Sequence, residues 1–174
     1  MMEAVRKWAG YLEHQTNDLL GVFTANVGKG YCTIFAAIIQ RHYRWRNFSG
    51  VPWCAVFLHA VFLEMYGKET ARRLLGKPHP GTRVLARRMR RRKCLMPPDY
   101  TPRPGDIIFL QNGDGRISHC GIVIEVYGYT VMTIEGNTVD PSGHFAPEQG
   151  GAVAIRERLF SDRAIMNYAK IEVK

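Results

Sequence analysis

The hydrophobic pattern of this chain changes at a proline-rich break between residues 97 and 105. Before the break, apolar residues recur at helical spacing, which predicts helices over residues 3–20, 33–41, 52–67 and 82–93. After the break, short apolar runs predict strands over residues 106–110, 119–127, 130–135, 152–157 and 169–173. Helices followed by strands favour an α+β fold in which the N-terminal helices pack on a small antiparallel sheet.

The bulk composition is that of a folded globular protein, with 46% apolar and 22% charged residues. A length of 174 residues is enough for one domain with a real core, and we expect a single domain over residues 1–174. No run of about 18 apolar residues occurs, so we expect no membrane span. The first 21 residues mix apolar and charged side chains, so we expect an amphipathic helix there and no secretory signal.

The chain has four cysteines, too few for a disulfide scaffold at this length. One disulfide is possible because the number is even, but we do not favour it. No two cysteines stand in a Cys-x-x-Cys pattern, so the spacing does not predict a zinc site. We therefore expect no metal and no cofactor.

One cysteine stands where its thiol would be reactive. Cys54 follows Pro52-Trp53 at the start of a strongly apolar segment, and proline is well tolerated at the first helical position. If Pro52 begins the helix, Cys54 is its third residue, where free backbone N–H groups and the helix dipole favour the thiolate. The same N–H groups could hold a developing oxyanion.

A histidine and a glutamate fall on two neighbouring predicted strands. His119 and Glu135 share one face of a hairpin if they pair directly, and the turn then centres on residue 127, next to Gly128. Glu135 would orient the His119 ring and stabilise its charged form. Asn137 lies two residues further along the same face and could support either side chain.

Three further residues could contact a substrate. Gly121, beside His119, would leave room for it, and Trp53 could form one wall of the cleft or pack in the core. His144 is the remaining histidine near enough in sequence to the Glu135 strand to line the cleft.

Each catalytic candidate also has an ordinary structural explanation. Cys54 could be a core cysteine, because free cysteine is among the most buried residues, and His119 could be a structural histidine. Glu135 is harder to explain in this way, because an unpaired carboxylate in an apolar strand is costly. Taken together, the helix position and the strand pattern favour a nucleophile, its base and an orienting carboxylate.

Positive charge is concentrated between Lys68 and Lys93. This segment has eleven basic residues and one acidic residue, a net charge of +10, while the whole chain carries +9. The segment could attract a polyanion, or it could be a solvated helix face. Thr82 could cap the helix of this segment, and Leu85 and Met89 could dock it on the core and leave most of the arginines in solvent.

These blocks of sequence resemble the CHAP family, the cysteine- and histidine-dependent amidohydrolases and peptidases. The matching blocks lie in the family's order between about residues 28 and 158 and are Pro52–Ala55, Pro104–Phe109, Ser118–Val123 and Ile134–Thr138. The resemblance implies a papain-like fold, with Cys54 as nucleophile, His119 as base and then acid, and Glu135 as orienting group. Asn137 matches a family position near the site.

The resemblance also implies an activity, which is hydrolysis of an amide in the peptide part of bacterial peptidoglycan through a thioacyl-enzyme. Some relatives bind calcium through acidic residues just before the cysteine, but residues 44–47 here are Arg-Trp-Arg-Asn, so we expect no calcium. The basic segment Lys68–Lys93 could contact anionic wall polymers. We expect a monomer, made in the cytoplasm, that acts at the cell wall after lysis-linked or other non-classical export.

Two other functions remain open. The first is an amidase toxin or effector delivered between cells, in place of a phage lysin or a wall-remodelling enzyme. The second is a nucleic-acid-binding protein that uses the basic segment, which we rank last because it leaves Cys54, His119 and Glu135 unexplained. The sequence does not distinguish hydrolysis from acyl transfer to an amine.

Overall fold

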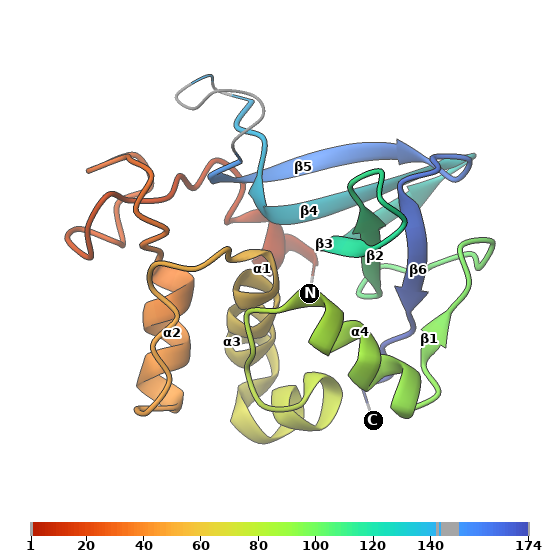
Figure 1. Ribbon diagram of the computed structural model, residues 1–174, viewed down its shortest axis with the longest axis horizontal. Helices are drawn as coiled ribbons and strands as arrows, with labels where there is room; N and C mark the ends of the chain where they lie inside the picture. Colours follow the sequence, from red (N-terminus) through yellow and green to blue (C-terminus); the bar gives the residue numbers. More distant parts are fainter. Residues whose placement is uncertain (1, 142, 144–149, 174) are drawn as a thin grey trace.

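The computed structural model describes residues 2–141, 143 and 150–173. Four helices precede six strands (Figure 1), and this order agrees with the change in periodicity, although the short β1 before the proline-rich break was not expected. The helices are α1 (Met2–Arg6), α2 (Ile34–His42), α3 (Cys54–Leu75) and α4 (Thr82–Arg91). The strands are β1 (Leu95–Met96), β2 (Ile107–Gln111), β3 (Ile117–Tyr127), β4 (Thr130–Thr138), β5 (Ala152–Leu159) and β6 (Ile165–Ala169).

The six strands form one antiparallel sheet in the order β1-β6-β2-β3-β4-β5. The main core lies between this sheet and helices α2, α3 and α4. A smaller apolar cluster that includes Ile108, Val123 and Tyr168 covers the other face of the sheet. The predicted α+β architecture is therefore confirmed. None of the described helices has the length and apolarity to cross a membrane.

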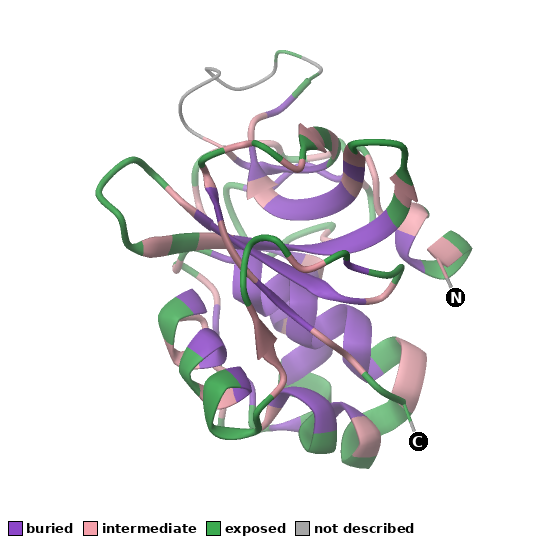
Figure 2. Ribbon diagram, turned by 90° about the vertical axis from the view of Figure 1, so that its right-hand side faces the viewer, coloured by how far each residue is buried: buried purple, intermediate pink, exposed green. Residues whose placement is uncertain are grey.

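Helix α3 passes through the centre of the molecule. Its first ten residues, Cys54 to Leu63, are all buried (Figure 2). Gly67 has non-helical backbone angles, φ +73° and ψ 170°, so the first helical segment of α3 ends there, as expected, and a second segment continues after this kink to Leu75. The helix begins at Cys54 with Trp53 as its N-cap, so Cys54 is the first helical residue and not the third.

Other element boundaries also differ from the expectations. The first helix ends at Arg6, and the chain after it forms isolated bridges at Leu12 and His14. Helix α4 begins at Thr82, which was expected to be its cap; the N-cap is Gly81. Strand β6 ends at Ala169, where the last strand was expected to begin. Most of the helix expected over residues 3–20 is therefore absent, and the last strand lies almost entirely before its expected place. Tertiary contacts override the local pattern in both segments.

The register between β3 and β4 differs by two residues from the expected one. Ile122 pairs with Ile134, which puts Gly121 opposite Glu135. An extra residue in β3, between Val123 and Glu125, makes a bulge in this pair of strands. His119 and Glu135 therefore share a face but meet along a diagonal and not directly across the pair.

We expect Gly136→Ala to destabilise the protein. A Cβ atom at this position would lie 2.6 Å from Phe57 Cβ and 2.8 Å from Cζ3 of Trp53. Overpacking of this kind costs about 1–3 kcal/mol of unfolding free energy. Urea denaturation measures the loss. Gly21→Ala is the matched control, since nothing lies within 4 Å of a Cβ there, and equal stability of the two variants would contradict the packing described.

Candidate active site

The structure brings Cys54, His119 and Glu135 together from three elements. Cys54 begins α3, His119 lies near the start of β3, and Glu135 lies on β4. His119 Nε2 is 2.9 Å from Glu135 Oε2, which leaves Nδ1 of the ring for Cys54. Hydrogen bonds link the Cys54 thiol to both His119 and Cys120. This is the connectivity of a nucleophile, its base and the group that orients the base.

The environment of Cys54 favours a thiolate. Hydrogen bonds from Cys120 and His119 hold the pKa of the Cys54 thiol well below its usual range, although burial acts in the opposite direction. The first turn of α3 contributes in the same sense, because no side chain caps its free N–H groups. Burial raises the pKa of the neighbouring Cys120 thiol far above its usual range, so Cys120 stays protonated and can donate.

His119 is correspondingly held in its charged form. Burial lowers the pKa of the ring, but hydrogen bonds to Cys54 and Glu135 outweigh this effect and raise the pKa to about 9. Cys54 and His119 therefore form a thiolate–imidazolium pair at neutral pH. The geometry and the pKa directions agree on this state.

Glu135 is buried with a 0% exposed side chain, yet it is ionised. Burial raises its pKa, but the hydrogen bond and charge of His119, together with Arg158 and Thr133, lower it to about 2. Arg158 Nε and Nη2 each donate to Glu135 at 3.0 Å, and the Thr133 hydroxyl donates at 2.6 Å. The carboxylate thus has the partners that a buried charge needs.

Sequence reasoning missed two contacts in this group. The sequence predicts a strand over residues 152–157, which does not include Arg158. In the structure this strand, β5, extends to Leu159 and carries Arg158. The position of Glu135 in an apolar strand does indicate that a cation lies nearby, because a buried carboxylate without a partner is costly. Thr82 was expected to cap α4, but its Oγ1 lies 3.3 Å from Cys54 Sγ, and Cys120 approaches the same hydroxyl at 4.0 Å.

The expected substrate contacts of Trp53 and Gly121 are wrong. Trp53 is fully buried, stacks on Phe35 and donates its indole N–H to Glu13 at 2.8 Å, so it cannot line a cleft. A Cβ at Gly121 would lie 2.6 Å from Glu135 Cγ. The space over Gly121 therefore accommodates Glu135 and not a substrate.

The predicted roles of Asn137 and His144 in the site are not decided by the structure. Asn137 is the extra residue of a bulge between Gly136 and Thr138 and has φ +56°, which removes it from the simple alternation of β4. Its Oδ1 is buried and has no hydrogen-bond partner among the described residues. Its support of the site stays a prediction. His144 lies outside the described residues.

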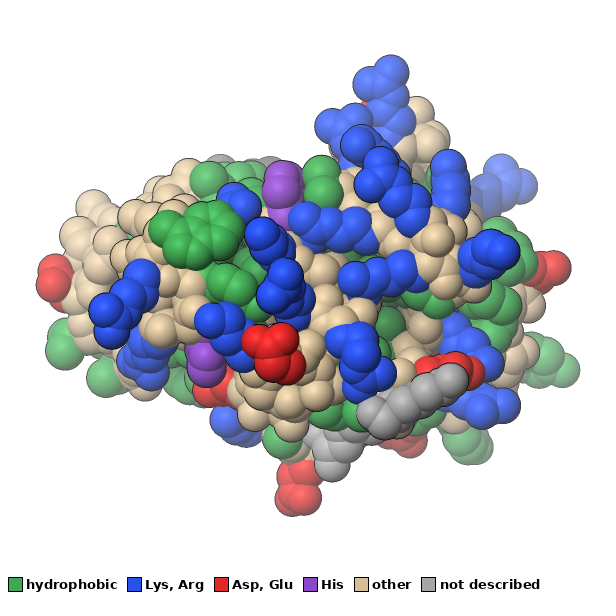
Figure 3. All heavy atoms as spheres, turned by 90° about the horizontal axis from the view of Figure 1, so that it is seen from below, with side chains coloured by type: hydrophobic (Ala, Val, Ile, Leu, Met, Phe, Trp, Pro, Cys, Tyr) green, Lys and Arg blue, Asp and Glu red, His purple; other side chains and the backbone are tan. Residues whose placement is uncertain are grey.

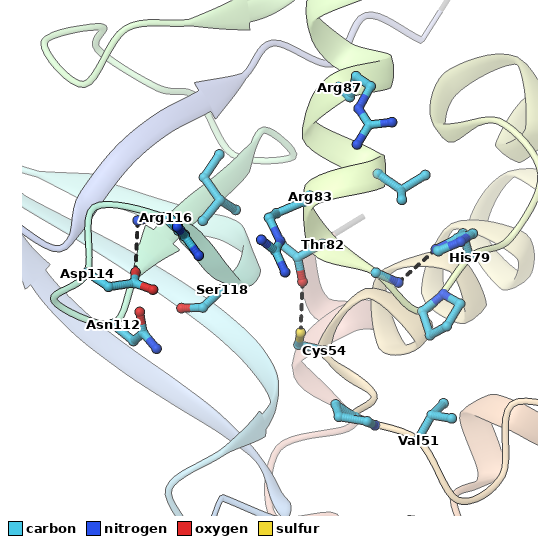
Figure 4. Close-up of a pocket in the computed structure, with 15 residues that line it drawn as sticks. Val51, Cys54, His79, Thr82, Arg83, Arg87, Asn112, Asp114, Arg116 and Ser118 are labelled. Atoms are coloured by element: carbon cyan, nitrogen blue, oxygen red, sulfur yellow. Dashed lines mark hydrogen bonds between the residues drawn. The ribbon is translucent and has the colours of Figure 1, made fainter.

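A cleft of about 770 Å³ opens beside Cys54. Its walls come from the start of α4 and the segment before it, from the β2–β3 loop, and from Val51 and Pro52 (Figure 4). Ser118, the residue before His119, also lines it. Cys54 itself also lines the cleft. Within the described residues, no three His, Cys, Asp or Glu side chains gather where they could hold a metal ion.

The basic segment Lys68–Lys93 occupies the end of α3, the following loop and α4. Leu85 and Met89 are fully buried and dock α4 as expected, while all of the segment's basic side chains except the half-buried Arg88 are exposed. Figure 3 shows lysines and arginines gathered on one face of the molecule. Contact of this face with anionic wall polymers stays a prediction.

All four cysteines of the chain are free thiols, so none of them forms a disulfide.

We expect Cys54 to react with iodoacetamide at nearly the same rate at about pH 6 and about pH 7.5. A thiol with the usual pKa of about 8.5 would gain roughly 30-fold over this interval, because the rate follows the thiolate fraction. Cys94 is the internal control, since burial raises the pKa of its thiol. Peptide mass spectrometry separates the two sites. A Cys54 rate that rises with pH like that of an ordinary thiol would contradict the ion pair.

Arg158→Gln should destabilise the protein by about 3 kcal/mol near neutral pH, because it removes one of the two cationic partners of a buried carboxylate and leaves it only His119. Glu135 has a depressed pKa when folded, so its contribution is present above the unfolded value of about 4.5 and is lost as the pH falls towards 2. The deficit should therefore shrink on acidification. Urea denaturation at several pH values measures it. Arg163→Gln, at an exposed arginine, is the control, and a deficit independent of pH would contradict the charge pairing.

Comparison with known proteins agrees with this geometry. A search of curated protein sequences finds no significant match. The CHAP domain family matches residues 24–137, which cover well over half of the chain and include Cys54, His119 and Glu135. The chain therefore belongs to the CHAP domain family, the cysteine- and histidine-dependent amidohydrolases and peptidases, and is a hydrolase of amide bonds.

Proposed function

We propose that this protein cleaves an amide bond in the peptide part of bacterial peptidoglycan through a thioacyl-enzyme on Cys54. One observation carries the proposal: a cysteine at a helix N-terminus contacts a histidine that is hydrogen-bonded to a fully buried, ionised glutamate. The cleft beside Cys54, of about 770 Å³, has the volume of a small-molecule or peptide-fragment site. The family's typical connection with cell walls supports the choice of substrate.

Acylation begins with attack of the Cys54 thiolate on the amide carbonyl carbon, which forms an S–C bond. The carbonyl oxygen gains the negative charge and turns towards the backbone N–H groups of the first turn of α3, which have no intrahelical acceptor. His119 then gives its Nδ1 proton to the amide nitrogen, the C–N bond breaks and the amine leaves. Glu135 holds the ring in place while its charge changes.

Deacylation reverses the roles with water as the nucleophile. Neutral His119 takes a proton from water, the resulting hydroxide attacks the thioacyl carbon, and a second oxyanion forms at the same place. The S–C bond breaks, releasing the carboxylic acid and restoring the thiolate–imidazolium pair.

In the resting state, the Thr82 hydroxyl donates a hydrogen bond to the Cys54 thiolate, since a thiolate can only accept.

The proposed place of action is the bacterial cell wall. A phage lysin and an effector delivered into another cell would use the same chemistry on the same polymer. The two roles differ in how the enzyme reaches the wall and not in the site.

We expect the purified protein to release new amine termini from peptidoglycan, and Cys54→Ala to lower the rate by on the order of 10³-fold or more, because the covalent route is lost. Cys94→Ala is the matched control at a half-buried cysteine away from the cleft. Amine-reactive labelling measures the rate, and mass spectrometry of the fragments identifies the bond. Release that persists in Cys54→Ala would refute the mechanism. If the folded wild type releases no amine from walls of differing composition, the substrate is wrong.

A further inference from the structure

Three arginines line the cleft that contains Cys54. Arg83 and Arg87 project from α4, and Arg116 comes from the loop between β2 and β3. Figure 4 shows Arg83 on α4 next to Thr82 and Cys54, Arg116 across the cleft beside Asp114, and Arg87 one turn further along the helix. The three side chains are exposed, so they are available to a ligand.

None of these arginines has an acidic partner within ion-pair distance among the described residues. Among the described residues, Asp114 is the one carboxylate that lines the cleft, and its Oδ1 accepts the backbone N–H of Arg116 at 2.9 Å. Asp114 thus braces the loop that carries Arg116. Three guanidinium groups against one carboxylate leave the cleft with a positive potential, which concentrates anions beside the thiol.

The positive lining continues beyond the cleft. A neighbouring hollow of about 320 Å³ shares Arg83, Arg87 and Arg116 with it and adds Arg90. Arg83, Arg87 and Arg90 are spaced at i, i+4 and i+7, so they lie on one face of α4. A chain bound at Cys54 would therefore pass along a row of arginines as it leaves the thiol on this side.

We propose that this enzyme is specific for peptides that carry a free carboxylate close to the scissile amide, with Arg83 and Arg116 as the carboxylate clamp and Arg87 as a secondary contact. The planar guanidinium matches a carboxylate in two parallel hydrogen bonds, which an amide cannot reproduce. Because the arginines share one cleft with the nucleophile, a carboxylate bound by them lies near the amide that Cys54 attacks. The inference rests on the proposed function and adds that the cut stem peptide is acidic and not amidated.

Binding tests this without catalysis. The ligand pair is a synthetic peptidoglycan stem peptide with a free side-chain carboxyl and the same peptide with that group as a carboxamide. Calorimetry with Cys54→Ala should show the acid form binding roughly tenfold or more tightly than the amide form. Adding Arg83→Gln and Arg116→Gln should abolish the difference by weakening the acid form alone. Arg91→Gln, on the same helix but outside both hollows, should retain it.

Kinetics of the enzyme with Cys54 intact separates this inference from the proposed function. The ratio of kcat/KM for the two peptides should favour the acid form in the wild type and approach one in Arg116→Gln, a single change on an exposed loop. If both peptides are cleaved equally and the arginine variants change nothing, the carboxylate clamp is overturned and the proposed function stands. If neither is cleaved but Cys54→Ala still selects the acid form, the proposed function fails and the clamp stands. Failure of both cleavage and selective binding overturns both.

Discussion

The buried charge of Glu135 is the constraint on which the site depends. An ionised carboxylate with no solvent contact is costly, and it persists only because a histidine, an arginine and a hydroxyl surround it. These partners come from β3, β4 and β5, so the register of three strands must be right at once. Gly121 is part of the same arrangement, because any side chain there would collide with Glu135. Because the Glu135 carboxylate needs these partners, the register of β3, β4 and β5 also fixes the orientation of the His119 ring.

The position of the nucleophile depends on packing in the main core. Trp53 is locked by Glu13 and Phe35, and its ring fits against the bare backbone of Gly136. This contact joins the start of α3 to β4, the strand that carries Glu135. Close packing of this kind holds Cys54 and the base in a fixed relation, which nucleophilic catalysis needs. Thr82 adds α4 to the same arrangement and ties the wall of the cleft to the thiol.

The electrostatics of the site divide into a neutral centre and a positive entrance. Thiolate and imidazolium cancel each other, and Glu135 is balanced by Arg158. The unpaired arginines of the cleft lie outside these pairs, exposed to solvent. The charged groups that activate the nucleophile are therefore different residues from the charged groups available to bind a substrate. In the proposed reaction, the inner groups set the rate of chemistry and the outer ones the choice of peptide.

The sequence by itself determined the α+β class, the central helix behind Cys54 and the strands that carry His119 and Glu135, because hydrophobic periodicity is a local property. It also pointed to a polar cluster, since a carboxylate in an apolar strand demands partners. Tertiary structure alone decided that Arg158 and Thr82 supply contacts, that Trp53 is buried, and that β3 and β4 pair two residues away from the simplest hairpin. A shift of two residues leaves every side chain on the same face of the sheet. The alternation of apolar and polar residues therefore could not distinguish the two registers. The bulge in β3 and the volume of side chains over Gly121 select the register, and both depend on residues distant in the chain.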